Sequence, residues 1–387
     1  MLFQNLSIPG KEGLFDISIE NDMISAMGPG SQPKRSENNW LEFRNAMVFP
    51  GLINSHEHLD FNLFPQLGNG SYSNYRIWGQ ELHKRFKPAI QEVMQVPQPL
   101  RTSWGIYKNL INGFTTVVNH GIPLPVSSTP IRVIQENNIL HSVGFEKYWF
   151  WKLNNPWARN LPFVVHIGEG TDKMAKKEID RLIHWNLFGR KLFGVHGVAM
   201  TSGQASKFEG LIWCPASNFF MLGQTAEISK IRDSTRILFG TDSTLTAGWN
   251  AWDHFRMARM AMQVKDQDLF DMLTVNPATS WNLSHKGILD PGMKADLVIA
   301  RIFAGPSWDS FFAINPCDIL LVLQEGKIRL FDQELQPDLD RDFNLPLGKY
   351  SKVKVGKSEK FISGDLPALL AKIRNYHPGF EPSWEMI

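Results

Sequence analysis

The chain has 387 residues, of which 43% are hydrophobic and 20% are charged, and its formal net charge is +2. This is the composition of an ordinary globular protein, and the near-balanced charge gives no electrostatic basis for binding nucleic acid or a membrane surface. Two cysteines are too few for a disulfide framework or a cysteine-based zinc site. With no signal-peptide pattern and no apolar run near the roughly 20 residues that span a bilayer, a cytoplasmic protein is expected.

The pattern of predicted elements changes twice along the chain. Residues 1–45 contain short strands separated by turns, and residues 287–340 return to the same pattern, so the two ends are expected to form one small β-domain. Residues 46–286 alternate β-rich apolar runs with longer segments that suit helices, which is the order of elements in a barrel of βα units. The tail, residues 341–387, is predicted to carry one helix that starts after Ser363 or Asp365.

Seven clear strand candidates lie in the barrel region. The segment 147–153 is a weaker candidate that completes the eight strands that a closed barrel needs. The predicted strands cover residues 46–54, 114–119, 139–146, 163–167, 191–197, 210–215 and 236–242, and the predicted helices cover residues 80–94, 101–112, 172–187, 250–263 and 266–274.

Residues that bind metal ions or move protons lie at the ends of these strands. The carboxyl ends of the strands of a (β/α)8 barrel meet at one mouth, so groups far apart in sequence are expected to lie together there. Alternate residues of an extended segment point the same way, so His56 and His58 can reach one ion. The complete set is His56, His58, His166, Glu169, His196 and Asp242.

Each of these residues also has an ordinary structural explanation. A single His near a strand end is more often a hydrogen-bonded core residue, and Asp242 in the sequence GTDS can simply cap the next helix. Imidazoles and a carboxylate are, however, the ligands that zinc or ferrous iron takes, and an open position leaves room for a water molecule. The order HxH, HxxE, H and D along the chain therefore favours a metal-dependent hydrolase.

Several segments together resemble the amidohydrolase superfamily, and in particular its mononuclear branch of cytosine, guanine and S-adenosylhomocysteine deaminases and triazine hydrolases. The resemblance covers most of residues 1–330. It rests on PGLINSHEHLD (50–60), GFTTVVNHG (113–121), VVHIGEG (164–170), VHGVAM (195–200), CPASNFFML (214–222), FGTDS (239–243) and the segments NPATSWNL and GILDPGMKADLVIA within 276–300.

This resemblance implies an α/β fold, a distorted TIM (β/α)8 barrel with a small β-sandwich domain built from both chain ends. It implies one divalent metal ion, zinc or alternatively iron, held by His56, His58, His166 and Asp242. His196 would stand beside a metal-bound hydroxide, Glu169 would protonate the ring nitrogen and shuttle protons to the leaving group, and Asp242 would take a proton from the attacking water. Relatives of this kind often form homodimers.

The sequence departs from the family pattern in two places. No lysine ends a fourth strand, where two-metal relatives have a carbamylated ligand, and this favours one ion. Only about twenty residues separate the predicted strand 139–146 from His166. The third and fourth βα units are therefore expected to be shortened, and residues 146–162 to reshape the pocket.

Four further residues are candidates for substrate contact. His120 ends the second strand, where it can line the pocket or form hydrogen bonds at the rim, and Ser217 and Asn218 can orient Asp242, touch substrate or stabilise a turn. Trp149 can stack on a planar ring, although most of the thirteen tryptophans must belong to the core.

Three functions fit these residues. The first is a hydrolase acting on carbon–nitrogen bonds other than peptide bonds, namely a deaminase of a purine, a pyrimidine or a pterin-like ring, and Glu169 supports it by offering ring protonation. The second keeps the same attack by hydroxide but opens a cyclic amide or imidazolone, or removes chlorine. The third is an inactive binding or scaffold barrel. In the first two functions the partner is a small molecule.

Overall fold

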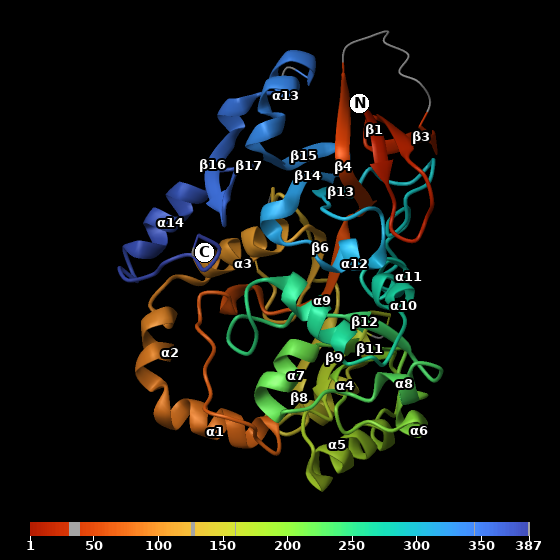
Figure 1. The fold of residues 1–387 in the computed structure, drawn as a ribbon. Coiled ribbons are helices and arrows are strands. Elements are labelled where there is room, and N and C mark those ends of the chain that lie inside the picture. The colour runs from red at the N-terminus through yellow and green to blue at the C-terminus, as the bar shows by residue number, and fades with distance from the viewer. Residues whose placement is uncertain (31–38, 125–127, 159, 344, 386–387) are drawn as a thin grey trace.

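The computed structural model describes residues 1–30, 39–124, 128–158, 160–343 and 345–385. Its centre is a barrel of parallel strands, with helices around it and a large sheet made from both chain ends beside it (Figure 1). Over the described ranges, no helix is long and apolar enough to cross a membrane.

Within the described residues, eight parallel strands make up the barrel wall in two sheets. The first sheet has the order β5-β6-β7, and the second has the order β12-β11-β10-β9-β8. An isolated parallel bridge between Glu57 and Asp242 joins the β5 edge to the β12 edge. The strands are β5 (Leu52–Glu57), β6 (Phe114–Asn119), β7 (Arg132–Ile134), β8 (Asn138–Ser142), β9 (Phe163–Ile167), β10 (Leu192–His196), β11 (Gly210–Trp213) and β12 (Arg236–Phe239).

The barrel interior is filled by side chains. One residue from each of several strands contributes to a closed apolar cluster, and Trp281 stacks on Phe193 with ring centroids 4.9 Å apart. A packed interior leaves the carboxyl-end mouth as the place for polar chemistry. The wall residues of this cluster include Ile53, Val118, Ile134, Val164, Val195, Ile212 and Leu238.

Helices cover the outside of the barrel where the sequence supplies amphipathic stretches with capping residues. Asn74 accepts hydrogen bonds from the amides of Arg76 and Ile77, and Asp172 accepts one from Ala175, as side chains at helix N-termini do. The helices are α1 (Tyr75–Arg85), α2 (Lys87–Met94), α3 (Gln98–Ile111), α4 (Trp149–Leu153), α5 (Lys173–His184), α6 (Ser202–Ala205), α7 (Pro215–Leu222), α8 (Ile228–Ile231), α9 (Ala251–Met260), α10 (Asp266–Asp271) and α11 (Val275–Ser280).

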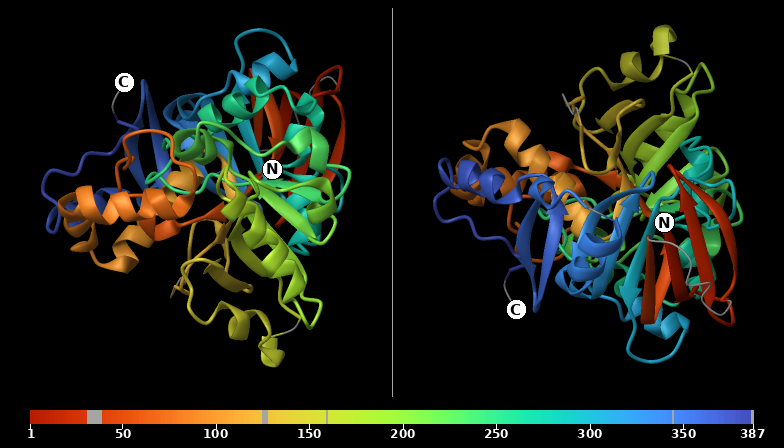
Figure 2. Two further views of the ribbon diagram at one scale, coloured as in Figure 1. Left: turned by 90° about the horizontal axis from the view of Figure 1, so that it is seen from below. Right: turned by 90° about the horizontal axis from the view of Figure 1, so that it is seen from above.

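The shortening expected in the third and fourth units is confirmed, but it begins earlier in the chain than predicted. Only residues 135–137 connect β7 to β8, and among the described strands these two are not paired. The segment 147–153, predicted as a strand, contains α4 instead, because Trp149 and Leu153 are four residues apart and bury one helical face. The yellow segment of Figure 2 that includes α4 stands away from the rest at one edge of the molecule.

The two chain ends meet in one sheet, to which the described part of the chain contributes nine strands in the order β16-β17-β15-β14-β13-β4-β1-β2-β3. The junction is the antiparallel pair of β4 and β13, so the expected β-domain from both ends is confirmed. Because β4 crosses residue 45, the domain boundaries themselves stay a prediction. The strands are β1 (Leu2–Ser7), β2 (Phe15–Glu20), β3 (Met23–Pro29), β4 (Trp40–Pro50), β13 (Leu297–Arg301), β14 (Ile319–Gln324), β15 (Lys327–Asp332), β16 (Tyr350–Val355) and β17 (Ser358–Ser363).

The C-terminal tail contains more structure than the one predicted helix. That helix is present as α14 (Leu366–Arg374), and the Asp365 side chain caps it, but β16 and β17 precede it as an unexpected extension of the sheet. Two further helices, α12 (Trp308–Phe312) and α13 (Gln336–Phe343), lie between strands. The chain then returns to α3, where Trp384 stacks on Trp104 with ring centroids 4.1 Å apart. Figure 1 shows α14 and the C-terminus beside α3.

Candidate active site

Three imidazoles and one carboxylate gather at the mouth of the barrel. The Nε2 atom of His166 lies 3.2 Å from Nε2 of His56 and 3.3 Å from Nε2 of His58. The Oδ1 atom of Asp242 lies 3.8 Å from Nε2 of His56 and 3.7 Å from Nε2 of His58. These residues come from β5 and the position just after it, from β9 and from the turn after β12, so three parts of the chain supply them.

These separations fit a metal ion. Two ligands in a tetrahedron around zinc, each about 2.0–2.1 Å from the ion, lie roughly 3.3 Å apart. Burial, followed by the other nearby histidines, lowers the pKa of His56 and of His166 well below its usual range. Both imidazoles are therefore neutral at physiological pH, which is the form that binds a metal.

The second oxygen of Asp242 is fixed from behind. Its Oδ2 atom accepts hydrogen bonds from the hydroxyls of Ser217 at 2.7 Å and Thr246 at 2.9 Å. Burial alone would raise the pKa of Asp242, but the nearby histidines and these hydrogen bonds outweigh it and lower the pKa. The backbone of Asp242 is left-handed, with a φ of 61°, and this sharp turn at the strand end aims the carboxylate at the imidazoles.

Glu169 and His196 lie beside the four possible ligands. Nε2 of His196 is 3.4 Å from Oε1 of Glu169, and Nδ1 of His196 is 2.9 Å from Nδ2 of Asn218. An amide nitrogen can only donate, so Nδ1 accepts and Nε2 carries the proton. Burial first, and then the Asp242 charge, raise the pKa of Glu169 well above its usual range. The carboxyl of Glu169 is therefore a proton donor near neutral pH.

A cavity of about 500 Å³ opens directly onto these groups. His58, His166, Glu169, His196 and Asp242 line its inner end. The rest of its wall is mostly aromatic and aliphatic, as is usual for a site that binds a small molecule. The five polar residues thus face a space in which a small organic molecule can lie.

Comparisons with known proteins agree with this geometry. Residues 157–329 match the amidohydrolase family. A 5-methylthioadenosine/S-adenosylhomocysteine deaminase of Pyrococcus furiosus is 27% identical over 221 residues, which are 48% of this chain and 50% of that protein. A 5'-deoxyadenosine deaminase of Methanococcus aeolicus is 23% identical over 376 residues, covering 78% of this chain and 85% of that protein.

A solved structure extends the similarity to the whole fold. An adenosine deaminase from Xanthomonas campestris, with bound zinc, superposes with a TM-score of 0.70 at 16% identity. The superposition covers 97% of each chain. It confirms the expected barrel with its accompanying β-domain.

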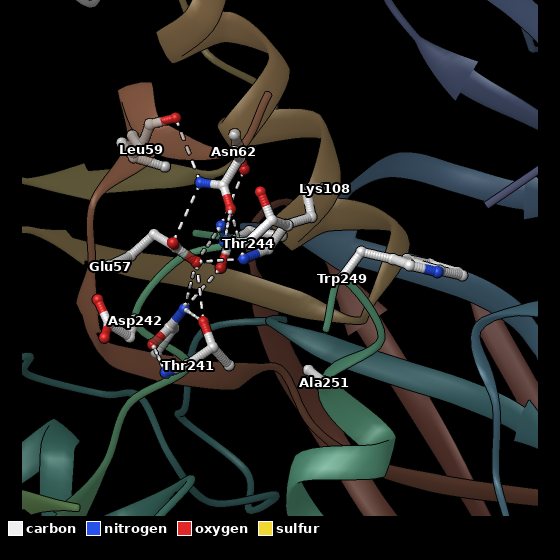
Figure 3. Close-up of polar contacts among 12 residues, drawn as sticks. Glu57, Leu59, Asn62, Lys108, Thr241, Asp242, Thr244, Trp249 and Ala251 are labelled. Atoms are coloured by element: carbon white, nitrogen blue, oxygen red, sulfur yellow. Dashed lines mark hydrogen bonds and ion pairs between the residues drawn. The ribbon is translucent and has the colours of Figure 1, made fainter. Parts of the chain in front are cut away.

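A buried polar network lies directly behind His56 and His58. Because successive side chains of a strand point to opposite sides, Glu57 points away from His56 and His58 and toward α3. Its Oε2 atom accepts from Lys108 Nζ at 2.7 Å and from Thr241 Oγ1 at 2.8 Å, and its Oε1 atom accepts from Asn62 Nδ2 at 3.1 Å. Figure 3 shows Glu57 surrounded by these three side chains. Thr241 precedes Asp242, so the network joins the two parts of the chain that carry His56, His58 and Asp242.

The close approach of α3 to this region depends on Gly105. A Cβ atom added there would lie 2.1 Å from the carbonyl oxygen of Leu59, next to His58. We expect Gly105→Ala to lower the free energy of unfolding by about 1–3 kcal/mol, since overpacking against backbone outweighs the better helix propensity of alanine. Gly203→Ala in α6 is the control, because its Cβ would meet nothing within 4 Å and the change should stabilise slightly. Chemical denaturation measures both, and equal effects would contradict the expectation.

The structure places the other predicted site residues in three ways. Ser217 and Asn218 hold Asp242 and His196, as given above. Trp149 is buried against the Arg181 guanidinium, 5.0 Å from its ring centroid, and does not line the cavity. His120 does not line the cavity either. It is buried behind it, and neither of its ring nitrogens has a hydrogen-bond partner among the described residues.

His120 offers a second grouping of ligand atoms. One ring nitrogen of His120, one of His56 and one of His166 all lie within 4.8 Å of one another. The set that contains His58 and Asp242 is the better substrate-facing site, because both of these residues line the cavity and a carboxylate balances the charge of the ion.

Sequence reasoning missed His141, whose side chain lines the cavity from β8. Its carbonyl oxygen is 2.8 Å from Nδ1 of His166, which places the proton on Nδ1 and leaves Nε2 for the metal. The same strand-end argument that selected the other histidines also applies to His141. The Glu57–Lys108 pair carried no comparable signal, because 51 residues separate its members.

Metal binding itself gives a direct check of the ligand set. We expect His166→Ala to bind zinc more than about 100-fold more weakly than the parent, since the loss of a direct ligand exceeds the effect of losing an outer partner. His184→Ala, at an exposed position on α5, should bind zinc as the parent does. Competition with a chromophoric chelator measures both affinities, and full retention of zinc by His166→Ala would contradict the assignment.

Proposed function

We propose that this protein is a mononuclear metal-dependent deaminase, which releases ammonia from an aminated nitrogen heterocycle. The observation that supports it most is the carboxyl of Glu169, buried at the inner end of the cavity beside His196 and beside the four proposed ligands. The names of the relatives, which are adenosine-type deaminases, point to the same reaction. The proposed ion is zinc, as in the Xanthomonas structure, with iron as the alternative.

The reaction replaces the amino group on a ring carbon by oxygen from water and releases ammonia. A divalent ion held by His56, His58, His166 and Asp242 would lower the pKa of a water molecule and so supply the nucleophile. Glu169, protonated because of its raised pKa, gives its proton to the ring nitrogen next to that carbon.

Asp242, Glu169 and His196 carry out or assist the remaining proton transfers. Asp242, whose pKa is lowered, is the acceptor for the proton of the attacking water. Glu169, now a carboxylate, takes the proton of the hydroxyl formed on the ring carbon and passes it to the departing nitrogen as the carbonyl forms. The proton held by Asp242 then returns Glu169 to its protonated form. His196, oriented by Asn218, donates its Nε2 proton toward this centre and orients Glu169.

Ammonia release from a panel of aminated purines, pyrimidines, pterins and triazines tests the proposal. The zinc-loaded protein should release ammonia with at least one class, and the product should carry a carbonyl in place of the amino group. Absence of ammonia from every member, with zinc bound, would refute it. Mass spectrometry separates the alternatives, because ring opening adds the mass of water and releases nothing, whereas dechlorination releases chloride.

Two assignments stay predictions alongside this one. A homodimer is expected, which light scattering of the purified protein checks. A cytoplasmic location without nucleic-acid binding is expected too, and cell fractionation and a gel-shift measurement check it.

A further inference from the structure

The cavity next to the proposed ligands has two unlike ends. The inner end is polar, as described above. The outer wall comes mainly from the segment between β5 and α3, which forms α1 and α2, and it consists of large apolar side chains. These are Phe61, Phe64, Trp78, Leu82, Ile90 and Met94.

Few polar groups of the outer end are free to bind a ligand. Among the residues that line the cavity, the carboxylates are Glu169 and Asp242, both at the inner end. The hydroxyl of Tyr75 already donates to Glu178 at 2.8 Å. Gln80 and His83 lie at exposed positions on α1. A hydroxyl group carried in among the apolar side chains of the cavity would therefore lose its water partners and find few replacements there.

The size of the cavity argues in the same direction. About 500 Å³ is more space than a bare aminated ring needs, so a ring bound at the inner end leaves the outer part to a substituent. Aromatic and aliphatic walls favour a substituent of the same kind, because its burial removes apolar surface from water.

We propose that the substrate is an aminated nitrogen heterocycle that bears an apolar alkyl or aryl substituent, directed at α1 and α2. Ribosides with free hydroxyl groups are poorer substrates. This inference rests on the proposed deaminase function, and it separates this protein from relatives named for nucleosides.

Matched pairs of compounds test this choice. The first pair is adenine that carries a cyclopentyl group and adenosine. The second pair is a diaminotriazine that carries an isopropyl group and its dihydroxypropyl analogue. We expect kcat/KM to favour the apolar member of each pair by at least about 100-fold, the scale on which unpaired polar groups are rejected. A ratio near one, or a preference for the hydroxylated member, would overturn the inference.

Binding measurements keep this inference separate from the proposed reaction. The same pairs are titrated by calorimetry into the zinc-loaded Glu169→Gln variant, which retains the apolar wall but lacks the proton donor. In one outcome the parent protein deaminates no compound, while the variant still binds the apolar members at least about tenfold more tightly. In that case the proposed reaction is wrong and the proposed ligand class stands. If the affinities are equal, the ligand class is wrong.

A substitution in the wall locates the substituent. Ile90→Asn in α2 places an amide against the substituent and should lower the preference for the apolar member at least about tenfold, through KM. Ile77→Asn is the matched control, since Ile77 lies on α1, is 45% exposed and is not part of the cavity wall. An unchanged preference in Ile90→Asn would contradict the proposed direction of the substituent.

Discussion

Replacing Glu169 with glutamine is expected to lower kcat by about 10²–10⁴-fold while zinc binding stays as in the parent. Glutamine has nearly the same shape, but its amide cannot give up a proton to a ring nitrogen and recover it. Glu169 is not one of the four proposed ligands, so the ion remains in place. Steady-state kinetics on any substrate found, together with metal analysis of the same preparation, measure the two effects separately.

A second carboxyl provides the matched control for this variant. Glu178 on α5 is also buried, and burial raises its pKa, but it bonds to Tyr75 and does not line the cavity. Glu178→Gln should therefore keep most of the activity. Unchanged turnover in Glu169→Gln would remove Glu169 from the proposed mechanism, and equal losses in both variants would point to a structural cause.

Replacing Lys108 with methionine is expected to lower the free energy of unfolding by about 3–5 kcal/mol. Lys108 is 1% exposed and Glu57 is 0% exposed, so the substitution leaves a carboxylate buried without its ion partner. The double variant Glu57→Gln, Lys108→Met should recover part of this loss, because no charge is then buried. Denaturation by urea at neutral pH measures all three proteins.

An exposed ion pair of similar length shows why burial decides the size of this effect. Lys352 Nζ lies 2.8 Å from Glu359 Oε2, with side chains 48% and 52% exposed. Lys352→Met should change the free energy of unfolding by at most about 1 kcal/mol, as for other exposed pairs. If Lys108→Met were equally mild, Glu57 would have to gain other partners in that variant.

The sequence was sufficient to predict the barrel strands that carry the site. FTTVVN and FVVHI form β6 and β9 with the predicted bounds, because short β-branched runs between turns have few other structures open to them. The polar residues at strand ends then meet at one mouth as a consequence of barrel topology alone. That rule placed His56, His58, His166 and Asp242 together, although up to 186 positions separate them along the chain.

Other parts could not be read from local pattern. The third strand, Arg132–Ile134, has three residues and too little alternation to be recognised. The run of aromatic residues made 147–153 look like a strand, although α4 buries only Trp149 and Leu153 of this segment. Likewise, nothing in the sequence around Lys108 indicates that it reaches Glu57. Such contacts depend on how closely α3 approaches β5, which is a property of the packed structure.

The alternation of His56, Glu57 and His58 along the chain links the proposed binding of a metal ion to the folding of the protein. An ion that binds only the native chain stabilises that chain by mass action, and Glu57, between the two proposed ligands, also holds the buried Lys108. Metal occupancy and resistance to unfolding are thus thermodynamically linked through a single tripeptide. Chelation should therefore lower the melting temperature of the parent, and a variant weakened at Lys108 should depend more on bound metal to remain folded.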